Sequence, residues 1–211
     1  MNIVIAPPFG KREQTKVRNR DMILAAAKRV FADKGYETAT VRDIIRGTDL
    51  ASGTFYNYFK SKDEIASAIA TDAAQRLRPI LHRQRLHAND FPSYLYGILS
   101  GYFRFLVEEY SIEGPNGRRV MRPPTTHDPT PAQTDVFRDI RSAVSDRFAA
   151  ELDAEADAEF ITAAITGIAR NIGLQMLYRK YQDPEGAARF AADIILRGLP
   201  LKGSPTKERR G

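Results

Sequence analysis

A close succession of helix start and stop signals in residues 17–64 is the feature that most limits what this 211-residue chain can fold into. Apolar residues at positions i, i+1, i+4, i+7 and i+8 predict one buried stripe along a first helix, over residues 17–34. Gly35 follows where a helix usually ends, because glycine adopts a left-handed backbone at little cost. The residues of the stripe are Ile23, Leu24, Ala27, Val30 and Phe31.

Two shorter helices and the start of a fourth are predicted directly after this one. Thr40 and Asp43 form a T-x-x-D start signal, in which the hydroxyl caps free amides of the first turn. A break at residues 48–51 then leads to a third short helix, over residues 52–59. Ser61 and Glu64 form a second capping box, ahead of a long fourth helix. Two short helices joined by a tight turn, with a longer helix before them, indicate a helix-turn-helix.

The third helix has one apolar and one polar face. At about 100° per residue, Phe55 and Phe59 share a face, and we expect both in the core. The opposite face centres on Gly53 and Asn57. Glycine lets a backbone approach a ligand closely, and asparagine can make two hydrogen bonds to an adenine edge in the major groove. The hydroxyl groups that flank them can bond phosphates, and they belong to Thr54 and Tyr56.

Positive charge is concentrated in the same part of the chain. Residues 1–62 hold 12 Lys and Arg against 6 Asp and Glu, whereas residues 63–211 hold 20 of each. The whole net charge of +6 therefore lies on residues 1–62, which include the predicted helix-turn-helix unit. A basic block joined to a neutral remainder is typical of a module that binds a polyanion.

The first third of the chain resembles the N-terminal domain of TetR-type transcriptional regulators. The resemblance rests on Gly35-Tyr36, Thr40-Val41, Ile44 and above all on the run from Ser52 to Asp63. It implies an all-α fold, with a three-helix DNA-binding domain followed by a larger helical domain for ligand binding and dimerisation. It also implies DNA contacts at Thr40, Arg42, Ser52, Gly53, Thr54, Tyr56, Asn57, Tyr58 and Lys62.

Three positions within or just before this run leave questions open. Asp49 stands where the family often has glycine in the turn, and Ala51 stands where it often has a hydroxyl cap. Alanine offers no capping oxygen, which costs about 1 kcal/mol at the start of a helix. Tyr58 fits either a DNA contact or a contact between helices.

Composition excludes several other classes of protein. The chain has no cysteine, so it forms no disulfide and has no thiolate metal site. His82 and His87 are five residues apart, which does not align them as a metal pair, and we expect no metal and no cofactor.

No apolar stretch reaches about eighteen residues, so we expect a cytoplasmic protein without a membrane span. We find no nucleophile and base at an informative spacing, and therefore expect no enzyme.

The rest of the sequence predicts further helices. These span residues 92–110, 133–152, 160–181 and 185–199, with Pro79 as a kink or a new start inside the fourth helix. Residues 111–131 hold Gly114-Pro115 and Pro123-Pro124 and predict a long irregular connection that could admit a ligand. The expected division is a flexible basic arm at 1–17, a helix-turn-helix domain at 18–62, a helical domain at 63–200 and a disordered basic tail at 201–211.

Two sets of residues in the second domain are candidates for its functions. Small residues allow close helix approach, and the resemblance implies dimerisation through the last two main helices; the alternative is a tightly packed monomer core. The candidates for this seam are Gly167, Gly173, Ala188 and Ala191. A ligand pocket needs apolar walls and a few polar groups, although each aromatic residue also fits an ordinary core. The candidates for the pocket are Tyr102, Phe103, Arg104, Tyr110, Phe137, Arg170 and Asn171.

The sequence thus predicts a homodimeric DNA-binding transcriptional regulator, a repressor that a small-molecule inducer releases from its operator. The alternative is a ligand-independent adaptor controlled by a protein partner. A closed apolar cavity in the second domain favours the inducer, and a packed core with an exposed apolar patch favours the adaptor.

Overall fold

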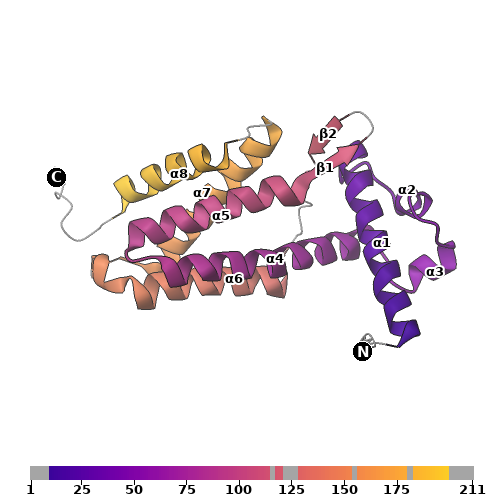
Figure 1. The fold of residues 1–211 in the computed structure, drawn as a ribbon, viewed down its shortest axis with the longest axis horizontal. Helices are drawn as coiled ribbons and strands as arrows, with labels where there is room; N and C mark the ends of the chain where they lie inside the picture. The colour runs from indigo at the N-terminus through magenta and orange to yellow at the C-terminus, as the bar shows by residue number, and fades with distance from the viewer. Residues whose placement is uncertain (1–9, 115–116, 121–127, 154–155, 180–182, 200–211) are drawn as a thin grey trace, which may run out of the picture.

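The computed structural model describes residues 10–114, 117–120, 128–153, 156–179 and 183–199. Helices dominate the chain, and Figure 1 shows α1, α2 and α3 at one end of an elongated bundle formed by the others. The α-helices are α1 Lys11–Lys34, α2 Val41–Arg46, α3 Ser52–Tyr56, α4 Lys62–His87, α5 Phe91–Tyr110, α6 Pro131–Ser142, α7 Ala158–Tyr178 and α8 Pro184–Gly198. The all-α prediction is confirmed, and the described residues add only one short hairpin to it.

Helix α1 begins earlier than the sequence predicted. It starts at Lys11, so residues 11–17 of the expected flexible arm are helical. Lys, Arg, Glu and Gln dominate its first turns, and such straight-chain residues lose little side-chain freedom in a helix. The helix ends as predicted at Gly35, whose φ of 78° lies in the left-handed region. Residues 1–9 and the tail at 201–211 lie outside the described residues.

The predicted caps of the next helices are present. Thr40 and Asp43 cap α2 reciprocally. At the start of α4 the Ser61 hydroxyl accepts a hydrogen bond from the Glu64 amide, but the Glu64 carboxylate accepts from the Lys60 amide and not from that of Ser61, so the expected capping box is only half formed. Ala51 provides no side-chain cap for α3, as expected. Helix α4 runs without interruption through Pro79, so this residue is neither the end of a helix nor the start of one. The expected domain boundary at residue 62 coincides with the first residue of α4.

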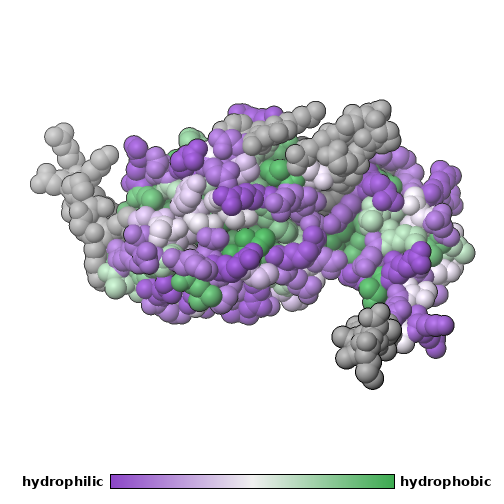
Figure 2. Space-filling model, viewed as in Figure 1, coloured by the Kyte–Doolittle hydropathy of each residue, from purple (hydrophilic) through white to green (hydrophobic). Residues whose placement is uncertain are grey.

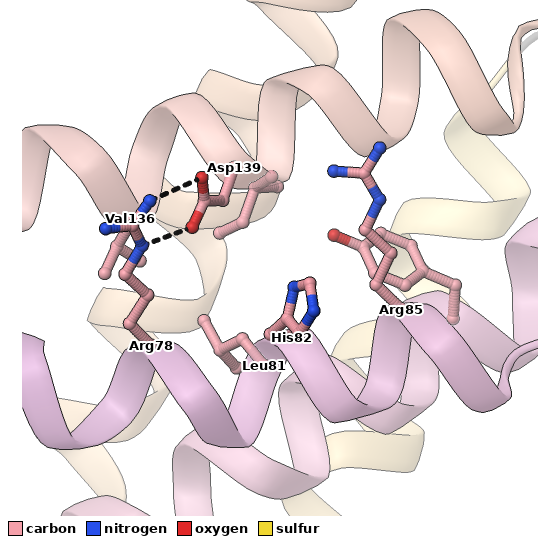
Figure 3. Close-up of a pocket in the computed structure, with 8 residues that line it drawn as sticks. Arg78, Leu81, His82, Arg85, Val136 and Asp139 are labelled. Carbon is pink, nitrogen blue, oxygen red and sulfur yellow. Dashed lines mark hydrogen bonds and ion pairs between the residues drawn. The ribbon is translucent and has the colours of Figure 1, made fainter.

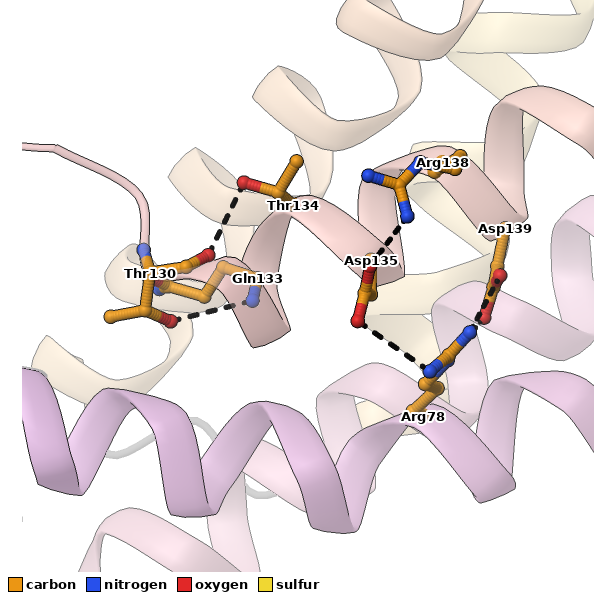
Figure 4. Close-up of polar contacts among 7 residues, drawn as sticks. All are labelled: Arg78, Thr130, Gln133, Thr134, Asp135, Arg138 and Asp139. Atoms are coloured by element: carbon orange, nitrogen blue, oxygen red, sulfur yellow. Dashed lines mark hydrogen bonds and ion pairs between the residues drawn. The ribbon is translucent and has the colours of Figure 1, made fainter.

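The helix predicted over residues 133–152 is divided. Reciprocal hydrogen bonds between Thr130 and Gln133 cap the start of α6 (Figure 4). Helix α6 ends at Ser142, and the chain continues as a π-helical turn, Ala143–Arg147. A short 3₁₀ turn, Ala149–Glu151, follows. A π turn holds one more residue than an α turn, which the apolar periodicity of the sequence does not reveal.

A two-stranded hairpin replaces part of the connection that we expected to be irregular. Strand β1, Ser111–Gly114, pairs antiparallel with β2, Gly117–Val120, and Gly114 faces Gly117 at the closed end. Strands of four residues are too short to show an alternating pattern clearly, so periodicity does not predict them. The Pro123-Pro124 pair lies outside the described residues.

Helix α5 lies at the centre of the second domain and contacts α4, α7 and α8. Its Asp90–Ser93 capping box starts a helix whose buried aromatic residues hold the core together. Tyr94 stacks on Phe148 with 5.0 Å between ring centroids, and Phe91 meets Phe148 edge-on at 6.0 Å. Hydrophilic residues cover most of the face that Figure 2 shows.

Candidate functional site

Buried phenylalanines fix the orientation of α3. Phe55 and Phe59 are both in the core, together with Ile44 of α2, as the sequence predicted. Burying a phenylalanine side chain stabilises by about 1.5–3 kcal/mol, so these contacts hold α3 firmly against the neighbouring helices. The opposite side of α3 is therefore turned to solvent.

The outward side of α3 carries the residues expected to meet DNA. Ser52, Gly53 and Asn57 are exposed, and the side chain of Tyr56 is half exposed. A β-carbon added at Gly53 would meet no atom within 4 Å, so nothing in the protomer requires a glycine there. Thr54 is half-buried. This face is small, polar and open to a duplex.

Helix α3 is shorter than predicted, but the chain stays helical beyond it. The helix ends at Tyr56, and Asn57 is its C-cap with φ −72° and ψ −17°. The Phe59 amide donates to the Phe55 carbonyl at 3.2 Å, which continues the turn by one more hydrogen bond. The side chain of Asn57 therefore still points away from the two phenylalanines.

The two candidates near α2 differ in how their side chains are used. The Thr40 hydroxyl donates to the Asp43 carboxylate at 2.7 Å and accepts from the Asp43 amide at 3.2 Å. Lys34 also pairs with this carboxylate at 2.6 Å, and the hydrogen bonds from Lys34 and Thr40 hold the pKa of Asp43 well below its usual range. Thr40 is thus engaged as a cap, whereas Arg42 is exposed at the start of α2.

Lys62 and Tyr58 make contacts within the protein. The Lys62 ammonium donates to the carbonyls of Tyr36 at 2.8 Å and Glu37 at 3.2 Å, and it lies 4.4 Å from the centre of the Tyr36 ring. An ammonium has three donors, so one is left for a phosphate. The Tyr58 hydroxyl accepts a hydrogen bond from the Asn19 amide at 3.2 Å, which supports the contact between helices.

These observations define a class of protein. Two short helices, α2 and α3, meet across a tight turn, and buried phenylalanines anchor α3. The free face of α3 is polar, and the first 62 residues carry the net positive charge of the chain. The chain is a helix-turn-helix DNA-binding protein.

Comparison with known proteins names the family. Residues 23–69 match the family described as bacterial regulatory proteins, tetR family, and this segment runs from α1 into α4. The chain therefore contains the DNA-binding segment that this family model describes. It is a transcriptional regulator and not an enzyme.

Individual relatives agree with this assignment. The HTH-type transcriptional regulator YdgC of Bacillus subtilis is 22% identical over 90% of this chain and 97% of its own length. The HTH-type transcriptional repressor Rv1474c of Mycobacterium tuberculosis is 33% identical over 67 residues, which are 32% of this chain and 36% of that repressor. The crystal structure of the regulator FadR from Bacillus subtilis in complex with stearoyl-CoA has a TM-score of 0.66 at 15% identity, covering 85% of this chain and 98% of that one.

Three of the four small residues expected at a dimer seam lie inside the protomer. Ala188 and Ala191 of α8 are fully buried, and Gly173 of α7 packs against α5. A β-carbon at Gly173 would lie only 2.4 Å from Leu106. The prediction is wrong for these residues, because the protomer already covers them. Gly167 is exposed, with nothing within 4 Å of an added β-carbon.

An apolar groove lies on the outer side of α7 and α8 instead. It is an open hollow of about 520 Å³, and Phe190 and Ile194, one turn apart on α8, are among its exposed apolar residues. The spacing of these two residues was the sequence signal that a search for small residues missed. The groove is lined by Ala163, Ala164, Gly167, Ile168, Asn171, Ile172, Phe190 and Ile194.

The same surface accounts for the unusual hydropathy of α7. Among the described residues, α7 is the one helix long and apolar enough to cross a membrane by length and composition, and only 39% of its most apolar window is buried. Core helices of soluble proteins meet the same criterion. Part of the exposed apolar surface of α7 lines the groove, whereas Phe160 and Tyr178 are exposed outside it.

The candidate ligand residues do not converge. Phe103 and Tyr110 are buried in the core. Tyr102 is partly buried, and the burial of its hydroxyl raises its pKa to about 12. Arg104 points outward and pairs with Glu185 of α8. Arg170 and Asn171 are also exposed, and Phe137 is half-buried on α6. Both arginines are therefore on the surface of the protomer, and neither provides a polar group inside a pocket of the core.

A small cavity lies between α4, α5 and α6 (Figure 3). Its volume is about 10 Å³, which is room for about one water. Arg78 crosses its edge and pairs with Asp139 at 2.6 Å, and His82 and Arg85 follow on the same side of α4. Tyr94 and Ile140 are among the remaining residues that line it. The core between these helices is closely packed.

Proposed function

We propose that this protein represses transcription by binding an operator as a homodimer, and that a small molecule releases it. The observation that carries the proposal is the free polar face of α3, held outward by Phe55 and Phe59. In this proposal Asn57 reads a base edge, Gly53 allows close approach, and the flanking hydroxyls bond phosphates. The proposed contacts are Thr40, Arg42, Ser52, Gly53, Thr54, Tyr56, Asn57, Tyr58 and Lys62, in a DNA-binding unit that ends where α4 begins.

The homodimer is supported by the apolar groove on α7 and α8. Exposed apolar residues that cluster on one surface mark an interaction site, and two copies of one patch form a closed two-fold interface. Such a dimer would present two α3 helices to half-sites about 34–36 Å apart, or a multiple of that distance. The closely packed core and the exposed groove are the combination that we expected for the adaptor, and a protein partner could use the same groove. We assign the groove to a second copy of this chain instead, because paired DNA half-sites call for two copies. Because its target is DNA, we place the protein in the cytoplasm.

The inducer proposal is supported by the fold shared with a regulator whose structure holds stearoyl-CoA. The described core of this chain has no ready-made space of that size between α4, α5 and α6, where the cavity is about 10 Å³. We therefore propose that an inducer enters by separating these helices, so that binding is coupled to a change in the position of α4. Of the candidate ligand residues, Phe137 lies on α6, whereas Tyr102 and Phe103 lie beside Gly173 of α7, so an opening that exposes them must also separate α5 from α7.

The experiment is selection of bound fragments from genomic DNA, followed by titration of the operator with two variants. Asn57→Ala should weaken operator binding by about 1–3 kcal/mol and leave binding to unrelated DNA unchanged, because it removes a base contact. Tyr56→Phe, the matched control, should weaken both alike, because it removes a phosphate contact. Wild-type operator affinity in Asn57→Ala would show that α3 does not read this sequence through Asn57.

A further inference from the structure

The first turns of α1 project from the rest of the protein. Every residue from Lys11 to Arg18 is exposed, and Figure 1 shows this end of α1 extending past α3. Its residues are polar except for Val17, which is 51% exposed, so packing against the rest of the protein does not stabilise this part of the helix.

The charges on this extension also oppose a helix. Residues 11–18 carry four cations against the single anion Glu13, and among the described residues no ion pair involves those cations. Arg12 and Lys16 are four residues apart, where two like charges destabilise a helix. A nearby polyanion would turn this repulsion into attraction. The four cations are Lys11, Arg12, Lys16 and Arg18.

Two contacts fix which side of α1 faces α3 and α4. The Asn19 amide donates to the Tyr58 hydroxyl at 3.2 Å, and Arg20 pairs with Asp72 of α4 at 3.3 Å. At about 100° per residue, Arg12 and Lys16 lie about 20° and 60° from Asn19 toward the side of Arg20, whereas Lys11 and Arg18 lie about 80° and 100° from Asn19 in the opposite direction. Arg12 is about 10 Å beyond Asn19 along the helix axis, at 1.5 Å per residue.

We propose that Arg12 and Lys16 form a second DNA-contacting surface, which binds the phosphate backbone beyond the segment that α3 occupies. The partner is double-stranded DNA, recognised by charge and not by base sequence. The inference rests on the proposed DNA binding by α3 and lengthens the contact that each protomer makes. Tyr58, at the end of α3, connects the two surfaces through its bond to Asn19.

The salt dependence of operator binding tests this surface. Removing one phosphate-binding cation lowers the slope of log K against log salt by about 0.9, so Arg12→Gln with Lys16→Gln should lower it by about 3.6 in a dimer. Lys11→Gln with Arg18→Gln makes the same change of charge on the other side of the helix and should leave the slope near the wild-type value. Glutamine favours helices about as well as lysine and arginine, so circular dichroism should match for all three proteins.

The outcomes separate this inference from the proposed function. Equal slope changes in both double variants would overturn the assignment to one side of α1, and a wild-type slope in the Arg12 and Lys16 variant would overturn it altogether. A changed sequence preference in that variant would overturn the phosphate contact. Asn57→Ala, measured in the same assay, tests α3 alone. If Asn57→Ala loses operator specificity while the Arg12 and Lys16 variant binds like wild type, the inference on α1 fails and the proposed DNA binding by α3 stands.

Discussion

One buried carboxylate joins three helices, and its removal should destabilise the whole protein. Glu109, near the end of α5, pairs with Lys28 of α1 through one oxygen and with Arg76 of α4 through the other. The side chain of Glu109 is 4% exposed, against 23% for Lys28 and 53% for Arg76. Burial alone would raise the pKa of Glu109, but hydrogen bonds from Arg76 and Lys28 and the charges of both outweigh it and lower the pKa.

Glu109→Gln removes the charge and leaves two cations facing a neutral amide. Breaking a buried pair costs about 3–5 kcal/mol and breaking an exposed one costs about 0–1 kcal/mol. Because Arg76 is half exposed, we expect a loss of about 3 kcal/mol, which lowers the Tm of a chain of this length by about 6–12 °C. Glu108→Gln, at the exposed neighbouring position, makes the same charge change and should shift Tm little.

The pH dependence gives a second measure of the same interaction. A carboxylate whose pKa is lower in the folded state stabilises the protein above its unfolded pKa, and this stability is lost as the pH falls through the folded pKa. The Tm difference between wild type and Glu109→Gln should thus be constant near neutrality and narrow below about pH 5. If Glu109→Gln and Glu108→Gln melt alike at pH 7, the carboxylate does not hold the three helices together.

Two further predictions concern the last helices. Phe190→Glu should convert the proposed dimer to a monomer at micromolar concentration in analytical ultracentrifugation. The variant should keep the Tm of the protomer, because Phe190 is exposed in it. A stable dimer in this variant would place the interface elsewhere. Gly173→Ala should cost about 1–3 kcal/mol in chemical denaturation, because its β-carbon would meet Leu106 at 2.4 Å, whereas Gly167→Ala meets nothing within 4 Å. Equal stability of these two variants would contradict the packing of α7 on α5.

The DNA-binding unit was readable from sequence because its signals are local. The stop at Gly35, the capping box at Thr40 and the shared face of Phe55 and Phe59 each depend on residues a few positions apart, and all three are confirmed. The start of α1 at Lys11 was missed because the basic run was interpreted by its charge and not by its helix propensity.

The second domain depends on contacts between distant residues, which periodicity does not specify. Ala188 and Gly167 are both small residues on apolar helices, yet one is fully buried and the other is exposed. Arg104 interrupts an apolar helix and was a candidate for the ligand pocket, but it pairs with Glu185, 81 residues away on α8. Which face of each helix is inward is decided by the neighbouring helices.

Helix α4 continues through Pro79 and bends more easily at that residue than elsewhere. Proline has no amide hydrogen, so the carbonyl of Gln75, four residues before Pro79, lacks its usual hydrogen bond within the helix. Arg76 lies in the turn of α4 before Pro79, and it forms an ion pair with Glu109 of α5. A movement of α4 that begins near His87 therefore reaches the DNA-binding unit at full size only while the Arg76–Glu109 ion pair is intact. Without that ion pair, α4 would bend at Pro79 and the movement would not be passed on.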